Sequence, residues 1–102
     1  MQLTPKEAER LLIFTAAELA RRRLAAGIPL SHPDAIALAS DTMLERARAG
    51  ASYEDVRASA RGLFSREQLV PGVAELLEAP AQIEVVFGDG TRLVPLEQLV
   101  QP

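Results

Sequence analysis

The sequence predicts an α+β fold, in which a body of four helices, packed in an orthogonal arrangement, precedes a C-terminal antiparallel β-hairpin. Signals that start a helix recur four times before residue 80, each followed by apolar residues at helical spacing. Apolar residues then alternate with a period of two from residue 82, on either side of the turn signal Gly88-Asp89-Gly90. No linker or repeat divides the chain, so residues 1–102 are expected to form a single domain.

The first helix is expected over residues 5–26, and local signals mark both of its ends. Thr4 can cap it, Pro5 suits the first helical position, and Glu7 completes a capping box with Thr4. Gly27 supplies a residue that commonly ends helices. The middle of this helix has no polar face, which is typical of a buried helix, but a chain of this size cannot bury all its apolar surface. We therefore expect this helix to be shared between the core and an interface.

The second helix is expected over residues 32–49, with a broad apolar stripe typical of a core helix. Ser31 can cap it, and Asp34 lies three residues on, as a capping box requires. An alternative start has His32 as the cap and Pro33 at the first helical position.

Two shorter helices are expected to follow, over residues 53–61 and 66–79. Pro71 falls inside the second of them, where it removes a backbone hydrogen bond and clashes with the preceding turn. We expect a kink at Pro71, or else a one-turn helix over residues 66–69 followed by a second helix over residues 71–79.

The hairpin is expected over residues 82–95. A two-residue turn at Asp89-Gly90 would set the register and place two apolar pairs on one face, namely Val85 with Val94 and Ile83 with Leu96. An isolated hairpin is marginally stable in water, so this face must pack on the helices or on another chain. The tail, residues 97–102, is too short to classify.

Composition excludes several classes of function. The 102 residues are 48% hydrophobic, with 11 basic and 14 acidic residues and a formal net charge of −3, which provides no broad positive field for nucleic acid. There is no cysteine, and no segment has the pattern of a signal peptide or the length of a membrane span. We expect a cytoplasmic protein with neither nucleic acid nor membrane as its partner.

The search for a catalytic, cofactor or metal site predicts none in this chain. His32 is the only histidine, so a two-histidine metal site cannot be built, and a cap or a surface contact is the favoured interpretation. No serine lies in a nucleophile elbow. Carboxylate pairs such as Glu54 and Asp55 are explained by solvated helix faces and caps.

A protein surface is therefore the predicted functional feature. The candidate interface residues are the excess apolar side chains of the first helix, two arginines near its end and the histidine that follows: Leu11, Phe14, Leu19, Arg21, Arg22 and His32.

Six segments, in this order and spacing, resemble the gamma subunit of bacterial urease over nearly the whole chain. They are LTPKE at residues 3–7, ARRRL at 20–24 with Gly27, PDAIAL at 33–38, ARAG at 47–50, SREQL at 65–69 with PGV at 71–73, and FGDGTRLV at 87–94. The resemblance implies a small α+β subunit that assembles with separate alpha and beta subunits, commonly as a trimer of heterotrimers. It also implies that urea is hydrolysed to ammonia and carbamate at two nickel ions held by the alpha subunit, without a ligand or catalytic residue from the gamma chain.

Two other hypotheses come from different classes. The alternative is a helical adaptor or regulator with no enzymatic role, with DNA as one candidate partner through the short helices of residues 52–77; the net charge and the lack of a basic recognition face count against DNA. The third is a free-standing enzyme that uses carboxylates, for which the sequence offers no convergent set of residues.

Overall fold

The computed structural model describes residues 2–102 and confirms the predicted α+β class, with helices first and a two-stranded antiparallel sheet at the end. Met1, which the predicted domain includes, lies outside the described residues. The elements, in chain order, are α1 (Pro5–Ala25), α2 (His32–Arg48), α3 (Tyr53–Ala58), the 3₁₀ turn η1 (Arg66–Gln68), α4 (Val73–Leu76), β1 (Gln82–Phe87) and β2 (Gly90–Pro95).

Both long helices begin where the sequence predicts. The Thr4 hydroxyl accepts a hydrogen bond from the backbone N–H of Glu7, whose carboxylate accepts one from the N–H of Thr4, and this capping box starts α1. Ser31 and Asp34 form the equivalent box at α2, so the alternative with His32 as the cap is wrong. The helices end at Ala25 and Arg48, each one residue before the predicted end, and glycines with positive φ follow within two residues.

The third helix is shorter than predicted, because it ends at Ala58 rather than at residue 61. The Ser59 hydroxyl donates to the carbonyl of Val56, and such local bonds compete with a regular helix. At Gly62, φ is +63° and the N–H donates to the carbonyl of Gln98 at 2.7 Å. The chain after α3 therefore turns to meet the C-terminal tail instead of extending the helix.

The predicted helix over residues 66–79 is wrong. Leu69 is extended, since it forms a parallel bridge with Leu30, in which the N–H of Leu30 donates to the carbonyl of Gln68 and the N–H of Val70 to the carbonyl of Leu30. The alternative with two helices is closer: its one-turn helix is present as the 3₁₀ turn η1, but the second helix begins at Val73 rather than at residue 71 and ends at Leu76. Pairing with a distant segment, together with Pro71, interrupts the helix.

The hairpin has the predicted faces but not the predicted register. Its two-residue loop is Gly88-Asp89 rather than Asp89-Gly90, so Ile83 pairs with Val94 and not with Leu96, and Val85 pairs with Arg92. A shift of two residues keeps every side chain on its original face. Val85 and Val94 are accordingly both buried, as an apolar inner face requires.

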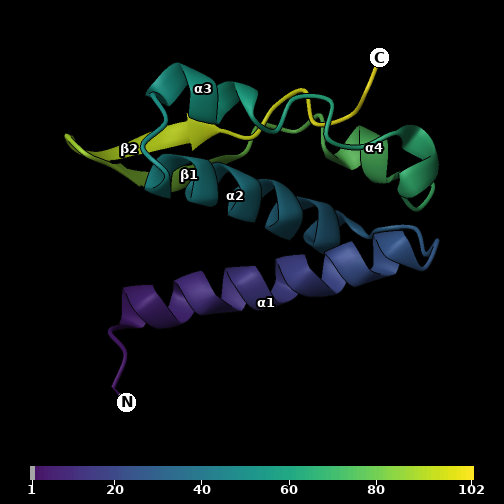
Figure 1. The fold of residues 1–102 in the computed structure, drawn as a ribbon. Helices are drawn as coiled ribbons and strands as arrows, with labels where there is room; N and C mark the ends of the chain where they lie inside the picture. Colours follow the sequence, from purple (N-terminus) through teal and green to yellow (C-terminus); the bar gives the residue numbers. More distant parts are fainter. Residues whose placement is uncertain (1) are drawn as a thin grey trace.

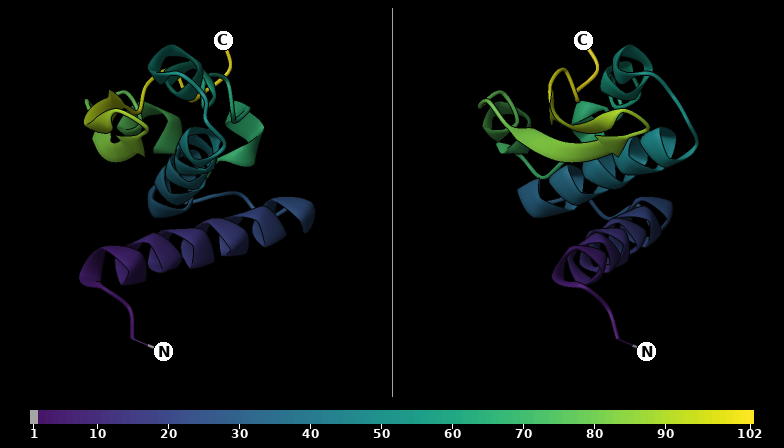
Figure 2. Two further views of the ribbon diagram at one scale, coloured as in Figure 1. Left: turned by 60° about the vertical axis from the view of Figure 1, so that its left-hand side comes forward. Right: turned by 90° about the vertical axis from the view of Figure 1, so that its left-hand side faces the viewer.

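The core lies on one side of α2. Figure 1 shows α2 at the centre, with α1 on one side and the hairpin and α3 on the other. Phe64, Met43 and Val56 are fully buried among the residues of this core, and Leu96 and Leu99 of the C-terminal segment are almost fully buried. The views in Figure 2 show α1 crossing α2 at an angle, as the outermost element of the molecule. The predicted orthogonal body therefore has α1 as its outer layer.

Candidate functional site

The outer surface of α1 carries the apolar side chains that the sequence singled out. Leu11, Phe14 and Leu19 are 47%, 46% and 47% exposed, although they lie on a helix that packs on α2. Leu12 is 70% exposed and was missing from the predicted interface, yet helical projection places it beside Leu19. Single exposed apolar residues are ordinary, but four on one helix form a surface that a partner could cover. We call Leu11, Leu12, Phe14 and Leu19 the outer face of α1.

The side of α1 that meets α2 is different in composition. Ala17 and Ala20 are fully buried there, and alanine allows the two helices to approach closely. Leu24 packs against the edge of the core. The apolar middle of α1 is thus divided: small residues meet α2, and most of the large ones remain exposed.

A buried carboxylate also links the two helices. The side chain of Asp41, in α2, is only 2% exposed and receives Arg10 at 2.8 Å and Arg21, both from α1. Arg10 also contacts Glu45 of α2 at 2.9 Å. We call these four residues the Asp41 cluster. A charge can be buried when it is paired, so the cluster explains how Asp41 occupies the apolar side of α2.

Sequence reasoning missed the Asp41 cluster, although one signal was available. Asp41 lies three residues from both Leu38 and Leu44, so helical spacing places it on the apolar stripe. A carboxylate at such a position needs a cationic partner. The first helix offered several arginines at separate positions, and the sequence did not tell which of them faces α2.

The predicted polar interface residues occupy three different environments. Arg21 donates to Asp41, and this hydrogen bond is the main cause that raises the pKa of Arg21 above its usual value. The side chain of Arg22 is 79% exposed, with Glu18 at 3.8 Å as its nearest acidic partner. His32 is half-buried at the first position of α2. Of the three, Arg22 is the most accessible to a partner.

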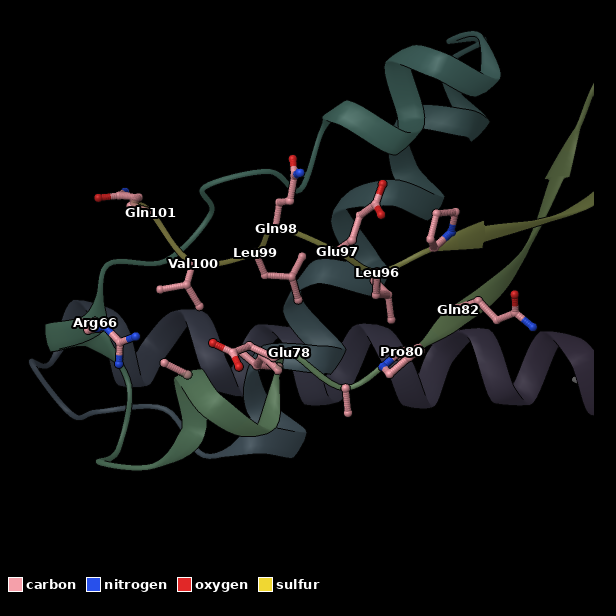
Figure 3. Close-up of a pocket in the computed structure, with 15 residues that line it drawn as sticks. Arg66, Glu78, Pro80, Gln82, Leu96, Glu97, Gln98, Leu99, Val100 and Gln101 are labelled. Atoms are coloured by element: carbon pink, nitrogen blue, oxygen red, sulfur yellow. The ribbon is translucent and has the colours of Figure 1, made fainter.

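A cavity of about 800 Å³ does not gather groups for catalysis. It lies between the segment after α4 and the C-terminal tail, and Figure 3 shows Arg66 and Gln82 toward opposite ends of it. Arg66 is paired with Glu75 at 2.8 Å, and Glu97 with Arg57 at 2.7 Å. The charged side chains that line the cavity are therefore largely held in ion pairs. The hypothesis of an enzyme that uses carboxylates gains no support from this cavity.

Residues 2–102 contain no group of three or more histidine, cysteine, aspartate or glutamate side chains placed to hold a metal ion. Within the same residues, no helix combines the length and the apolar character needed to cross a membrane.

The region proposed for DNA in the alternative hypothesis is short of free positive charge. Residues 52–77 contain only α3, η1 and α4, the longest of which has 6 residues. Arg57 and Arg66 are paired with carboxylates, while Arg61 is exposed. This arrangement lacks the clustered basic face that a DNA-binding helix presents to phosphates.

Comparisons with known proteins agree with the resemblance seen in the sequence motifs. The family model described as "Urease, gamma subunit" matches residues 1–100. A curated relative, the urease subunit gamma of Natronomonas pharaonis, is 48% identical over 101 residues, which cover 99% of this chain and 92% of the relative. An identity of this size over the full fold confirms the predicted family: the chain belongs to the urease gamma-subunit family.

Proposed function

We propose that this subunit of a urease complex has a structural, noncatalytic role and that it docks on its partners through the outer face of α1. The observation that carries the proposal is the exposure of Leu11, Leu12, Phe14 and Leu19 on a helix that binds α2 through Arg10 and Arg21. Burying such side chains at an interface is favourable. Arg22 would lie at the rim, where charged side chains remain partly hydrated. Arg21 and His32 stay predicted members of the same interface.

The proposed partners are urease alpha and beta subunits, with a trimer of heterotrimers as the assembly and the cytoplasm as its location. Urea hydrolysis to ammonia and carbamate would occur on the alpha subunit, at two nickel ions. The basis for these finer statements is the resemblance to the bacterial gamma subunits, and membership of the family supports them.

The residues of this chain do not fit a nickel site of their own. His32 is the single histidine, there is no cysteine, and no cluster of three donor side chains occurs within residues 2–102. Imidazole is the usual nitrogen ligand for nickel in proteins, and one imidazole cannot hold two ions. We therefore assign this chain no step of the chemistry and propose that it stabilises the assembly.

The docking proposal is tested by charge substitution on the outer face. Phe14→Asp and Leu11→Asp should abolish co-purification with the large urease subunit while the helix content of the free chain, measured by circular dichroism, stays within a few per cent of the original. Both side chains are already about half exposed, so an aspartate can be hydrated without unfolding α1.

Leu76→Asp supplies a matched control, because Leu76 is 58% exposed but lies on α4. This variant should still co-purify with the large subunit. If all three variants co-purify normally, or if Leu76→Asp alone prevents co-purification, the interface does not lie on α1.

The noncatalytic role needs a separate measurement. The purified chain should release no ammonia from urea and should bind nickel with no defined stoichiometry in equilibrium dialysis. One tightly bound nickel ion per chain would overturn this assignment.

A further inference from the structure

α1 is attached to the rest of the chain mainly through one element, α2. It packs on α2, and a groove of about 660 Å³ lies between its N-terminal half, the end of α2 and the hairpin. Ile13 and Phe87 line this groove from opposite sides. Across it, the described residues include one ion pair, between Lys6 and Glu84 at 4.0 Å, with both side chains largely exposed. Such a pair contributes little to stability.

The apolar part of this attachment is modest. In α1, Ala17 and Ala20 are buried and Ile13 and Leu24 are half-buried, whereas the core beyond α2 fully buries larger side chains such as that of Phe64. The hydrophobic effect scales with the apolar area removed from water, so the side chains of α1 contribute less than those core residues. The polar groups therefore carry a larger share of the stability of the contact between α1 and α2.

The principal polar group is Asp41, whose hydration depends on whether α1 covers it. While α1 is in place, the carboxylate is almost fully buried and depends on Arg10 and Arg21 for compensation. If α1 moved away, water would hydrate Asp41 directly. Arg23 adds a second link at the other end, with Asp34 at 2.7 Å.

We infer that α1 is a separately opening element, held on α2 by the Asp41 cluster, and that in the free chain it detaches without unfolding of α2, the hairpin and the tail. Local opening of this kind occurs where few apolar contacts hold an element. A detached helix is only marginally stable in water, so its amide hydrogens exchange. This inference concerns the free chain and does not depend on the proposed role in a urease.

Hydrogen–deuterium exchange of the full chain, followed residue by residue, tests the inference. Amides in the middle of α1 should exchange about tenfold or more faster than those of Val85 and Val94 in the hairpin, which exchange through global unfolding. Low concentrations of urea should accelerate the core amides and change the α1 amides little, because detachment exposes less surface than unfolding.

Arg21→Gln identifies the role of the cluster. It leaves Asp41 buried with one partner, which raises the free energy of the closed chain relative to both the open and the unfolded states, so the amides of α1 and of the core should both exchange about tenfold faster. Arg22→Gln is the matched control, since the neighbouring Arg22 has no contact with Asp41 among the described ion pairs, and it should change neither set.

Two results would overturn the inference. One is equal protection and equal urea dependence of α1 and the hairpin in the unmodified chain, which would mean that they unfold together. The other is an unchanged exchange rate of the α1 amides in Arg21→Gln, which would mean that the Asp41 cluster does not hold the helix. The first measurement needs no variant, so it remains decisive even if Arg21→Gln fails to fold.

Discussion

Substitution of two phenylalanines should distinguish residues that stabilise the fold from residues that contribute to assembly. Phe64 is 0% exposed and belongs to the core, whereas Phe14 is 46% exposed on the outer face of α1. Truncating a fully buried phenylalanine to alanine costs about 3–5 kcal/mol, which is at least about a fifth of the 5–15 kcal/mol by which a typical domain is stable. Full burial of a phenylalanine side chain contributes roughly 1.5–3 kcal/mol to stability, and Phe14, which is half exposed, contributes about half of this. The higher helix propensity of alanine would offset about 0.5 kcal/mol of the loss in Phe14→Ala.

The expected losses are therefore about 3–5 kcal/mol for Phe64→Ala and below about 1 kcal/mol for Phe14→Ala in the free chain. Urea denaturation followed by circular dichroism measures both, with the midpoint falling much further for Phe64→Ala. Binding to the large urease subunit, measured at a temperature where both variants are folded, should reverse the order. Equal losses of stability would refute the division of the chain into a core and an exposed docking helix.

Three further predictions concern local features. The pKa of Glu7 is lowered by hydrogen bonds from the backbone and the hydroxyl of Thr4. The stabilisation of α1 by the Glu7 carboxylate is therefore present above pH 4.5 and is lost as the pH falls through the lowered pKa. Glu7→Gln keeps the capping bonds and should remove this acid sensitivity, as measured by hydrogen exchange in the first turn of α1. Ala20→Leu should lower the free energy of unfolding by about 1–3 kcal/mol in urea denaturation, because Ala20 is fully buried between α1 and α2. An unchanged urea midpoint would mean that the contact between the helices accommodates a larger side chain. Gly90 has φ +130° with open space around it, so Gly90→Ala should lower the melting temperature through backbone strain alone, while Gly88→Ala, at a position without positive φ, should lower it less.

The ends of the long helices were predictable because their signals are local. Thr4 with Glu7, and Ser31 with Asp34, contain within four residues all the groups that make each capping box. The segment 66–79 was not predictable on this basis. Its conformation depends on the bridge between Leu69 and Leu30, which the fold brings together from distant parts of the chain, and short-range periodicity carries no information about such a pair.

For the hairpin, the predicted register was wrong but the predicted faces were correct. Asp89 has a glycine on each side, so the sequence allows either neighbour to share the two-residue loop with it. The faces were nevertheless correct, because both registers keep Val85 and Val94 on the same side. For the candidate site, the excess of apolar residues on α1 was visible in the sequence, whereas the Asp41 cluster required knowledge of which arginines face α2.

The last prediction concerns the tail, residues 97–102, which the sequence left unclassified. The tail is an integral part of the core: Leu99 is 2% exposed, and its carbonyl accepts a hydrogen bond from the N–H of Phe64 at 2.9 Å. The backbone N–H of Gln101 then donates to the carbonyl of Phe64 at 2.7 Å, so the tail bonds both backbone groups of Phe64, whose side chain is fully buried.

Removal of residues 97–102 would expose Phe64 and take their backbone partners from three backbone groups: the N–H of Gly62 and the N–H and carbonyl of Phe64. We expect this truncation to abolish the cooperative unfolding transition, whereas removal of Pro102 alone, which is exposed, should leave the urea midpoint unchanged. Leu99→Ala provides an intermediate case that keeps the backbone bonds, with an expected cost of about 2–5 kcal/mol. A truncated chain that still unfolds cooperatively at the original midpoint would mean that the tail only rests on the core. Because the tail and α1 lie on different sides of α2, the loss caused by Leu99→Ala should add to that caused by Arg21→Gln, since independent sites show additive changes in the free energy of unfolding.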